Sequence, residues 1–365
     1  NAVGLPGGAG GAPRPLVLVE CDDSASASRA ATHLVDRVRV PVILGAGASG
    51  TTLTVAQEVT IPKGVLLFAP SATSPALTTL QDNGLVWRSA PSDALQAVAL
   101  VDAMESMEAR YRAENAVAPA TALKLSIVYK NDAYGSGLLA ALTTSARING
   151  KAVTDASNAA SVATTSYDAA ATDLSAQVAA IVAARPALLV LLGTTEAVTK
   201  VLAPLEAAWP QGGSAPPRPA YLLVDGGRKP ELLAAIGANP GLRARVRGTV
   251  PGSPTPSLTF QAFQLRYQGK FGAPVPAIFG MSGAYDAFYM VMYGMVAAGN
   301  GPLTGASIAA ALPRVVQEGG TVLEVGGSNI GRGLQTLQSG NGLRLRGASG
   351  PLDFDAATGE APNDV

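Results

Sequence analysis

The sequence predicts an α/β protein whose parallel sheets are divided between two lobes. Apolar runs rich in β-branched residues alternate with helical patterns from end to end, which is the order expected of parallel βαβ units. The runs are nearly continuous in hydrophobic residues, as expected when helices cover both faces of a sheet. With 365 residues, the chain is also longer than one hydrophobic core usually supports, so we expect two domains.

The expected strands and helices follow one another along the chain. Aliphatic and β-branched runs predict strands at Leu16–Glu20, Val40–Leu44, Gly64–Phe68, Leu123–Tyr129, Ala187–Leu192, Ala220–Val224 and Gly248–Val250. A further short strand is expected to end at Trp87 and Arg88. Apolar residues at helical spacing predict helices at Asp93–Glu114, Ser136–Ile148, Thr172–Ala184 and Glu196–Ala208. Because helices separate the strands, neighbouring strands are expected to be parallel.

Loop-forming residues mark three expected crossings between the lobes. They are the segments Ala116–Ala122, Thr249–Pro256 and Glu318–Gly327. Too few strands follow residue 253 for an independent sheet, so that part is expected to return to the first lobe. We therefore predict lobe 1 from residues 1–118 and about 253–320, and lobe 2 from residues 119–252 and about 321–365. Several crossings make a hinge, with a ligand cleft between the lobes.

The composition excludes several classes of function. The chain carries 26 basic and 26 acidic residues without a Lys/Arg block, so nucleic acid and anionic membranes are poor partners. Cys21 and His33 are its only cysteine and histidine, which disfavours zinc sites, Cys–His pairs and disulfide frameworks. Cys21 is expected in the core at a strand end. No run of about 18 apolar residues predicts a membrane span. The Gly/Pro-rich residues 4–15 predict a loop at the start of a mature or trimmed chain.

Gly45, Gly47 and Gly50 form a GxGxxG pattern between a predicted strand and a predicted helix. In dinucleotide-binding folds, this pattern places a pyrophosphate on the helix N-terminus, and an acidic residue ends the next strand. Here the next strand ends in Ala-Pro-Ser, which disfavours a nucleotide cofactor. The same backbone amides can instead hold a carboxylate, with Ser49 adding a hydroxyl.

Ser71 and Thr73 follow the neighbouring strand. At the carboxyl edge of a parallel sheet, the backbone of residues 71–73 and the Thr73 hydroxyl would face the same crevice as Ser49, so the two loops would form one polar anchor for a ligand. Serine and threonine are also common helix N-caps, so capping is the competing interpretation for either loop.

Tyr134 and Asp225 are the candidates in the second lobe. The ring of Tyr134, in a strand-to-helix loop, can cover an apolar ligand group or pack at the rim. Asp225 follows a predicted strand, and its carboxylate can pair with a ligand ammonium or form a solvated turn. No nucleophile with a neighbouring base accompanies them, so binding is favoured over catalysis.

Taken in order, the motifs resemble the type I periplasmic solute-binding proteins of branched-chain amino acid ABC importers. The resemblance covers nearly the whole chain and rests on the segments VLVECDDSASASRAATHLV, PVILGAGASGTTL, GVLLFAPSATSPALT, VWRSAPSDALQ, LSIVYKNDAYGSGLL, GAYDAFYMVMYGM and GASGPLDFD. It implies two doubly wound, Rossmann-like α/β lobes joined by a multi-strand hinge that closes on a ligand.

The resemblance implies ligand contacts in lobe 1. Ser49 would hold the ligand carboxylate, and Gly47 would add its backbone. The next loop would present a carbonyl, amides and a hydroxyl from Ser71, Ala72 and Thr73.

In lobe 2, the resemblance implies a ligand contact for Tyr134 and an ion pair between Asp225 and the ligand ammonium. Thr195 would add a further loop contact. Ligand specificity would depend on loops such as 194–197 and 279–284.

Partners and location also follow from the resemblance. It implies a monomeric, non-enzymatic receptor without cofactor or metal, which delivers a small amino acid or related carboxylate to an ABC permease from the periplasm or another extracytoplasmic space. A lipid anchor would require a segment outside this sequence. Members of the family begin with another strand and helix, which precede the part matched here, and Ala25 and Ala48 stand where some carry a disulfide. A ligand-sensing domain of a regulator is an alternative with the same fold, and a nucleotide-dependent enzyme is a third.

Overall fold

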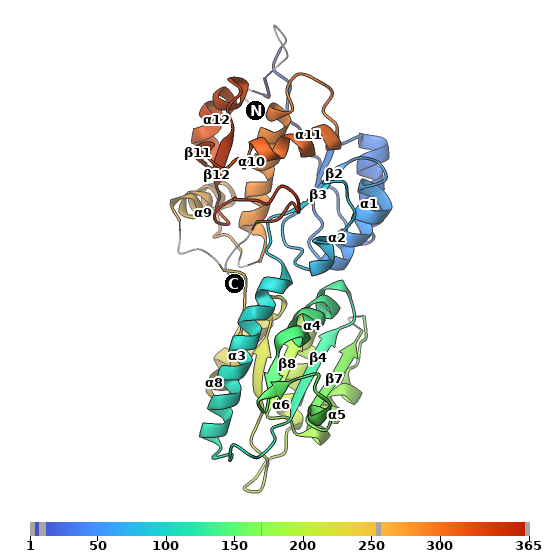
Figure 1. The fold of residues 1–365 in the computed structure, drawn as a ribbon, viewed down its shortest axis with the longest axis vertical. Helices are drawn as coiled ribbons and strands as arrows, with labels where there is room; N and C mark the ends of the chain where they lie inside the picture. Colours follow the sequence, from blue (N-terminus) through green and yellow to red (C-terminus); the bar gives the residue numbers. More distant parts are fainter. Residues whose placement is uncertain (1–3, 7–11, 169, 253–256, 277, 362–365) are drawn as a thin grey trace. The chain divides into compact units, whose positions relative to one another are not determined.

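The computed structural model describes residues 4–6, 12–168, 170–252, 257–276 and 278–361. It divides the chain into two compact units, shown in Figure 1. Unit 1 comprises Asn1–Ser92 and Gly252–Asp364, and unit 2 comprises Asp93–Pro251. Each unit has its own sheets and its own buried hydrophobic clusters.

Unit 2 contains a five-stranded parallel sheet. Its strands are β4 (Leu125–Lys130), β7 (Val162–Tyr167), β8 (Leu188–Leu192), β9 (Ala220–Leu223) and β10 (Val246–Gly248), in the order β10-β9-β8-β4-β7. The chain begins the sheet at β4, adds β7 on one side and then β8, β9 and β10 on the other. The direction of winding therefore reverses beside β4, where such sheets bind ligands.

Helices cover both faces of the unit 2 sheet, as the continuous apolar strands predict. On one face, Leu100 and Met104 of α3 (Asp93–Glu114) and Leu138 of α4 (Ala133–Ser145) pack against β4 and β8. The other face is covered by α5 (Ser175–Ala184), η5 (Ala197–Leu202), α6 (Ala203–Ala208), α7 (Pro230–Ala238) and α8 (Pro240–Arg245). Shorter elements are β5 (Arg147–Ile148), β6 (Lys151–Ala152), η4 (Ala156–Asn158) and η6 (Asp225–Gly227).

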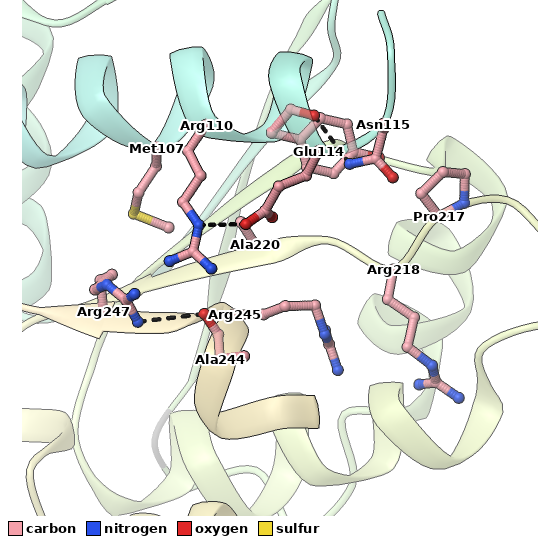
Figure 2. A pocket seen from close by; sticks show the side chains of 11 residues that line it. Met107, Arg110, Glu114, Asn115, Pro217, Arg218, Ala220, Ala244, Arg245 and Arg247 are labelled. Carbon is pink, nitrogen blue, oxygen red and sulfur yellow. Dashed lines mark hydrogen bonds and ion pairs between the residues drawn. The ribbon is translucent and has the colours of Figure 1, made fainter. Parts of the chain in front are cut away.

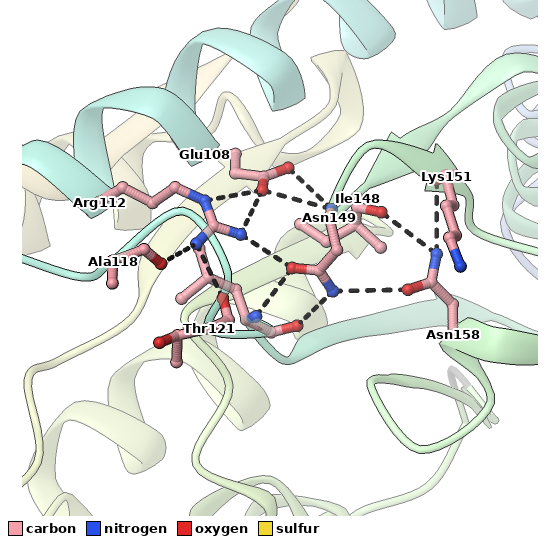
Figure 3. Close-up of polar contacts among 9 residues, drawn as sticks. Glu108, Arg112, Ala118, Thr121, Ile148, Asn149, Lys151 and Asn158 are labelled. Atoms are coloured by element: carbon pink, nitrogen blue, oxygen red, sulfur yellow. Dashed lines mark hydrogen bonds and ion pairs between the residues drawn. The ribbon is translucent and has the colours of Figure 1, made fainter.

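A polar network fastens the C-terminal half of α3 within unit 2, as Figure 3 shows. Arg112 pairs with Glu108 at 2.7 Å and donates to the side-chain oxygen of Asn149 at 2.9 Å. Arg112 also donates to the carbonyl of Thr121 at 2.8 Å. The predicted crossing at residues 116–122 is therefore a connection inside unit 2.

Unit 1 contains a three-stranded parallel sheet, in the order β1-β2-β3, and a two-stranded parallel sheet. Their strands are β1 (Val42–Leu44), β2 (Leu66–Ala69), β3 (Val86–Arg88), β11 (Thr321–Glu324) and β12 (Leu343–Arg346). The helices of the described part are α1 (Ala27–His33), η1 (Leu34–Val38), α2 (Ser49–Val55), η2 (Ala56–Thr60), η3 (Pro75–Leu77), α9 (Leu258–Phe271), α10 (Met281–Ala297), α11 (Gly305–Ala311), η7 (Leu312–Arg314), η8 (Gly327–Asn329) and α12 (Ile330–Gln338). Side chains of α1 and α2 cover one face of the larger sheet, and those of α10 and α11 cover the other. Among the described helices of the chain, none is long and apolar enough to cross a membrane.

The division into units differs from the predicted one in two segments. Helix α3 belongs to unit 2, because its buried side chains pack against α4, and the crossing falls between Ser92 and Asp93. The chain after residue 320 belongs to unit 1, because β11 and β12 share a core with α10 and α12. A boundary at Pro251 agrees with the predicted crossing Thr249–Pro256, of which residues 253–256 lie outside the described part.

No strand forms at Leu16–Glu20, contrary to the prediction. Val17 and Leu18 are 72% and 64% exposed, and none of the described strands pairs with this segment. A strand needs a neighbour for its backbone hydrogen bonds, which an apolar pattern alone does not supply. Cys21 is exposed for the same reason and is not a core residue.

Candidate functional site

The loops at the carboxyl ends of β4, β8 and β9 bring polar side chains together at one edge of the unit 2 sheet. Tyr134, Thr194, Glu196 and Asp225 follow these strands, and they are joined by Gln96 of α3 and Tyr167 at the end of β7. The first two loops flank the point where the winding of the sheet reverses. This edge is the candidate site of unit 2.

Local sequence fixes the position of Tyr134. Asp132 caps α4, accepting hydrogen bonds from the amides of Tyr134 and Gly135 at 3.0 and 2.9 Å. Gly135 allows the helix to begin against the strand, because a Cβ there would lie 2.2 Å from the carbonyl oxygen of Lys130. The cap and the glycine therefore bring the tyrosine ring to the sheet edge, where it is 8% exposed.

Tyr134 and Asp225 form a hydrogen-bonded pair. The Tyr134 hydroxyl donates to Oδ1 of Asp225 at 2.5 Å and accepts from the amide of Gly226 at 3.0 Å. Burial raises the pKa of Tyr134 well above its ordinary value, and the negative charges of Asp225 and Asp93 raise it further. The phenol therefore keeps its proton and holds the carboxylate in place.

Asp225 has polar neighbours besides Tyr134. Burial raises its pKa, while contacts with Tyr134, Gly226 and Gln96 act in the opposite direction. Gln96, which is 1% exposed, donates from its amide nitrogen to Thr249, and its side-chain oxygen has no hydrogen-bond partner among the described residues. Gln96, Tyr134 and Asp225, called the Tyr134 cluster below, therefore present acceptor oxygens to a donor.

A second carboxylate, Glu196, follows β8. It accepts hydrogen bonds from the hydroxyls of Thr194 at 2.5 Å and Tyr167 at 3.0 Å. Burial would raise the pKa of Glu196, but these hydrogen bonds and the charge of Lys130 outweigh it, so the pKa lies below its ordinary value. The sequence reasoning missed Glu196 and Gln96 and chose Thr195, which is half-buried beside Glu196. Asp225 was identified because its carboxylate follows a buried strand. Glu196 follows the buried strand β8 and could have been identified by the same criterion.

In unit 1, the two predicted loops contact each other directly. The hydroxyl oxygen of Ser49 accepts hydrogen bonds from the amides of Thr73 and Ser74 at 3.2 and 3.1 Å. The Ser71 hydroxyl donates to the carbonyl of Gly47 at 2.8 Å. The loops after β1 and β2 therefore form one unit, as the sequence predicts.

The Ser49 side chain joins the two loops of unit 1. It is 3% exposed, and it does not cap α2, whose N-cap residue is Ala48. Its hydroxyl holds the loop after β2 by accepting a hydrogen bond from the Thr73 amide. Ser71, in the same loop, is half-buried. Ala72 and Thr73 are buried at 0% and 2% exposure.

The segment 279–284 lies against the same loop of unit 1. A Cβ at Gly280 would lie 2.7 Å from Cβ of Ser71, and a Cβ at Gly283 would lie 2.5 Å from the hydroxyl of Ser89. Small residues at the start of α10 therefore let it approach the loop after β2.

A separate hollow of about 280 Å³ lies where β9 and β10 begin, at the opposite end of the unit 2 sheet (Figure 2). Arginines line it, but Arg110 pairs with Glu114, and Arg218 and Arg245 pair with Glu206. Three of the arginines that line the hollow are therefore held in ion pairs within the protein.

Comparison with known proteins is consistent with this architecture. The sequence profile of the periplasmic binding protein family matches residues 5–362. No curated protein matches the chain.

Solved structures give the fold. The chain is similar to the leucine binding protein LivK of Thermotoga maritima, with 19% identity and a TM-score of 0.62 over 95% of this chain and 82% of that one. It is also similar to LivJ of Streptococcus pneumoniae in complex with isoleucine, with 18% identity and a TM-score of 0.62 over 97% of this chain and 83% of that one. A third similar structure is an ABC transporter solute binding protein of R. palustris in complex with benzoate, with 15% identity and a TM-score of 0.63 over 94% of this chain and 79% of that one. These similarities confirm the predicted type I fold, and the extent of the profile match shows that the chain belongs to the periplasmic binding protein family.

Proposed function

We propose that the chain is a solute receptor that binds a small amino acid or related carboxylate outside the cytoplasmic membrane and delivers it to an ABC permease, without changing it chemically. The observation that carries the proposal is the Tyr134 cluster, which has a carboxylate and a buried amide oxygen but no base placed beside a nucleophile. The family match supports a receptor, and the names of the similar structures support transport.

The Tyr134 cluster suits a ligand ammonium. An ammonium offers three N–H donors, and the proposed acceptors are the Asp225 carboxylate and Oε1 of Gln96, which has no hydrogen-bond partner among the described residues. Charge-assisted hydrogen bonds of this kind are roughly twice as strong as neutral ones. Exclusion of water on binding would strengthen them further.

The loops of unit 1 suit the ligand carboxylate. The proposed contacts are the hydroxyls of Ser71 and Thr73 and the backbone of Gly47 and Ala72. Ser49 would hold the second loop in place through its hydrogen bond with the Thr73 amide. Closure of the two units around the ligand, by a hinge, would then create the form that a permease recognises.

A thermal-shift screen tests the proposal. The probes are the amino acids, aliphatic and aromatic carboxylates without an amine, and NAD. At 100 times its dissociation constant, a true ligand stabilises the fold by about 2.7 kcal/mol. We expect one class of amino acid to raise the melting temperature of the wild type, and this effect to be lost in Asp225→Asn.

Tyr111→Phe is the matched control, because the half-buried Tyr111 lies on α3 outside the Tyr134 cluster. It should keep the ligand-induced shift. A response to NAD alone, or to none of the probes, would contradict the proposed function. Stimulation of ATP hydrolysis by a reconstituted permease would separate transport from sensing.

A further inference from the structure

The hollow shown in Figure 2 lies at the end of the unit 2 sheet that is opposite the Tyr134 cluster. Its walls come from the last turns of α3, the segment that leads into β9, and the junction between α8 and β10. Because a helix rises about 1.5 Å per residue, Arg110 at the hollow lies about 21 Å along α3 from Gln96 of the Tyr134 cluster. A molecule in the hollow would therefore not compete for the Tyr134 cluster.

The hollow has more positive than negative charge. The described residues that line it include four arginines and one acidic residue, namely Arg110, Arg218, Arg245, Arg247 and Glu114. Glu206, beside the hollow, pairs with two of these arginines. Four guanidinium groups therefore face two carboxylates, which leaves an excess of two positive charges.

The Glu206 carboxylate is fully engaged by its own neighbours. Its Oε1 accepts hydrogen bonds from the Tyr221 hydroxyl and from Arg245, and its Oε2 accepts from Arg245 at 2.7 Å and Arg218 at 3.1 Å. Burial would raise the pKa of Glu206, but the hydrogen bonds from Arg245 and Tyr221 outweigh it, so the pKa lies below its ordinary value. Glu206 therefore does not neutralise the remaining arginines of the hollow.

Arg247 is the arginine of the hollow without an acidic partner. Its side chain is exposed, and no carboxylate of the described residues forms an ion pair with it. Its Nη1 donates to the carbonyls of Ala244 and Val246 at 3.3 and 2.7 Å, as suits a cation at the C-terminus of α8. No described residue accepts a hydrogen bond from its Nε or Nη2. These two nitrogens form the side edge of the guanidinium, which can bind both oxygens of a carboxylate.

Arg110 can join Arg247 in binding an anion. Its Nε donates to Glu114 at 2.6 Å, but the two side chains are 43% and 53% exposed, and exposed pairs of this kind are weak. The arginine also precedes the glutamate, which is the less favourable order on a helix. Figure 2 shows the Arg110 side chain extending from α3 toward the strands that carry Ala220 and Arg247. An anion can therefore bind Arg110 without disrupting a strong interaction.

The remaining wall of the hollow is largely apolar. Met107, Pro217, Ala220 and Ala244 contribute to it. The volume of about 280 Å³ lies just below the roughly 300 Å³ at which pockets for drug-sized molecules begin. The hollow therefore suits one small molecule that combines an anionic group with a compact apolar body.

We propose that this hollow is a second binding site, which takes a small organic carboxylate. The carboxylate contacts Arg247 and Arg110, and the apolar body lies against Met107 and Pro217. The proposal does not depend on the ligand of the Tyr134 cluster, because the two sites share no residue.

Calorimetric titration with 2-naphthoate tests the proposal in the wild type and two matched variants. Arg247→Gln removes the proposed contact. Arg243→Gln removes the same charge from an exposed residue of α8 that does not line the hollow. We expect saturable binding to the wild type, weakened about tenfold or more in Arg247→Gln and less than about twofold in Arg243→Gln.

Three further measurements locate the binding and define the ligand class. The methyl resonance of Met107 should shift when 2-naphthoate is added. The neutral analogue 2-naphthamide and inorganic phosphate should each bind at least about tenfold more weakly than 2-naphthoate, because each lacks one of the two features that the hollow recognises. Asp225→Asn should leave this binding unchanged, which separates it from the proposed function of the Tyr134 cluster.

Several results would overturn the proposal. Equal affinities of the two arginine variants would show that Arg247 does not contact the ligand. Equal binding of the carboxylate and the amide would show an apolar site without anion recognition, and equal binding of phosphate would show that no organic body is needed. Loss of binding in Asp225→Asn alone would place the probe at the Tyr134 cluster, and absence of saturation at about 1 mM would show that the hollow is not a site.

Discussion

Tyr134 donates a hydrogen bond of 2.5 Å to Asp225, a residue 91 positions later in the chain. The bond joins the loop after β4 to the loop after β9, across the edge of the sheet where polar side chains gather. The carboxylate of Asp225 is also the proposed acceptor for a ligand ammonium. The pair therefore links the stability of unit 2 to its proposed binding function.

Tyr134→Phe should destabilise unit 2. The change removes the donor to Asp225 and the acceptor for the Gly226 amide, leaving buried polar groups unsatisfied at a cost of about 1–3 kcal/mol. Equilibrium unfolding in urea measures the loss. Tyr111→Phe is the control, and an equal small effect of both substitutions would show that the hydrogen bonds contribute little.

Gly226→Ala should disturb the same pair by a steric route. The new Cβ would lie 2.7 Å from the Tyr134 hydroxyl and 2.9 Å from the Gly193 carbonyl oxygen, so the loop must shift, at a cost of about 1–3 kcal/mol. Gly237→Ala, in α7 with no atom within 4 Å of the new Cβ, should be neutral or stabilising. Thermal unfolding of both variants tests this difference in stability. Equal melting temperatures would show that the loop around Gly226 is loosely packed.

Ser49→Ala should weaken unit 1 more than Ser71→Ala does. Ser49 is buried and accepts from two backbone amides, whereas the half-buried Ser71 donates one hydrogen bond that water can replace. We expect a loss of about 1–3 kcal/mol for Ser49→Ala and less than about 1 kcal/mol for Ser71→Ala. Chemical denaturation gives both values, and the reverse order would contradict the bracing role of Ser49.

The stability of unit 1 should fall as the pH rises towards 6. Burial raises the pKa of Asp286 from 3.8 to about 6, against the hydrogen bonds that it accepts from Ser349 and Ala348. Between these values, the native carboxyl binds a proton more tightly than the unfolded one, so the free energy of unfolding decreases with pH. The decrease is on the order of 3 kcal/mol across the window and is complete above it.

Asp286→Asn should remove this part of the pH dependence. The measurement is the free energy of unfolding of both proteins at pH 4 and pH 7. Parallel pH profiles would show that Asp286 is ionised in the native protein at its ordinary pKa.

Local sequence predicted the parts of the fold that depend on apolar runs. The strand expected at Ala187–Leu192 is β8, and the helix Asp93–Glu114 has the predicted bounds. β7 was missed because its outer residues, such as Thr164 and Thr165, are polar and exposed at the sheet edge. The segment 16–20 has the pattern of a strand without a described partner, and pairing is not a local property.

The location of the candidate site was predictable from the sequence, but the roles of its residues were less so. Strand ends identified Tyr134, Asp225 and the Ser49 loop, because parallel strands place their carboxyl ends at one edge. The inward orientation of Ser49 and the hydrogen bond from Tyr134 to Asp225 depend on how loops that are distant in the sequence pack together. Gln96 was missed because it reaches the edge from the first turn of α3 and does not follow a strand.

The most direct test of the central claim is a calorimetric titration with the amino acid found in the screen and with its analogue that lacks the amino group. Both ligands are titrated into the wild type and into Asp225→Asn, which forms a double-mutant cycle. If Asp225 pairs with the ammonium, removing the amine weakens binding to the wild type by about tenfold or more and has little further effect in the variant. An equal loss in both proteins would show that the ammonium is bound elsewhere.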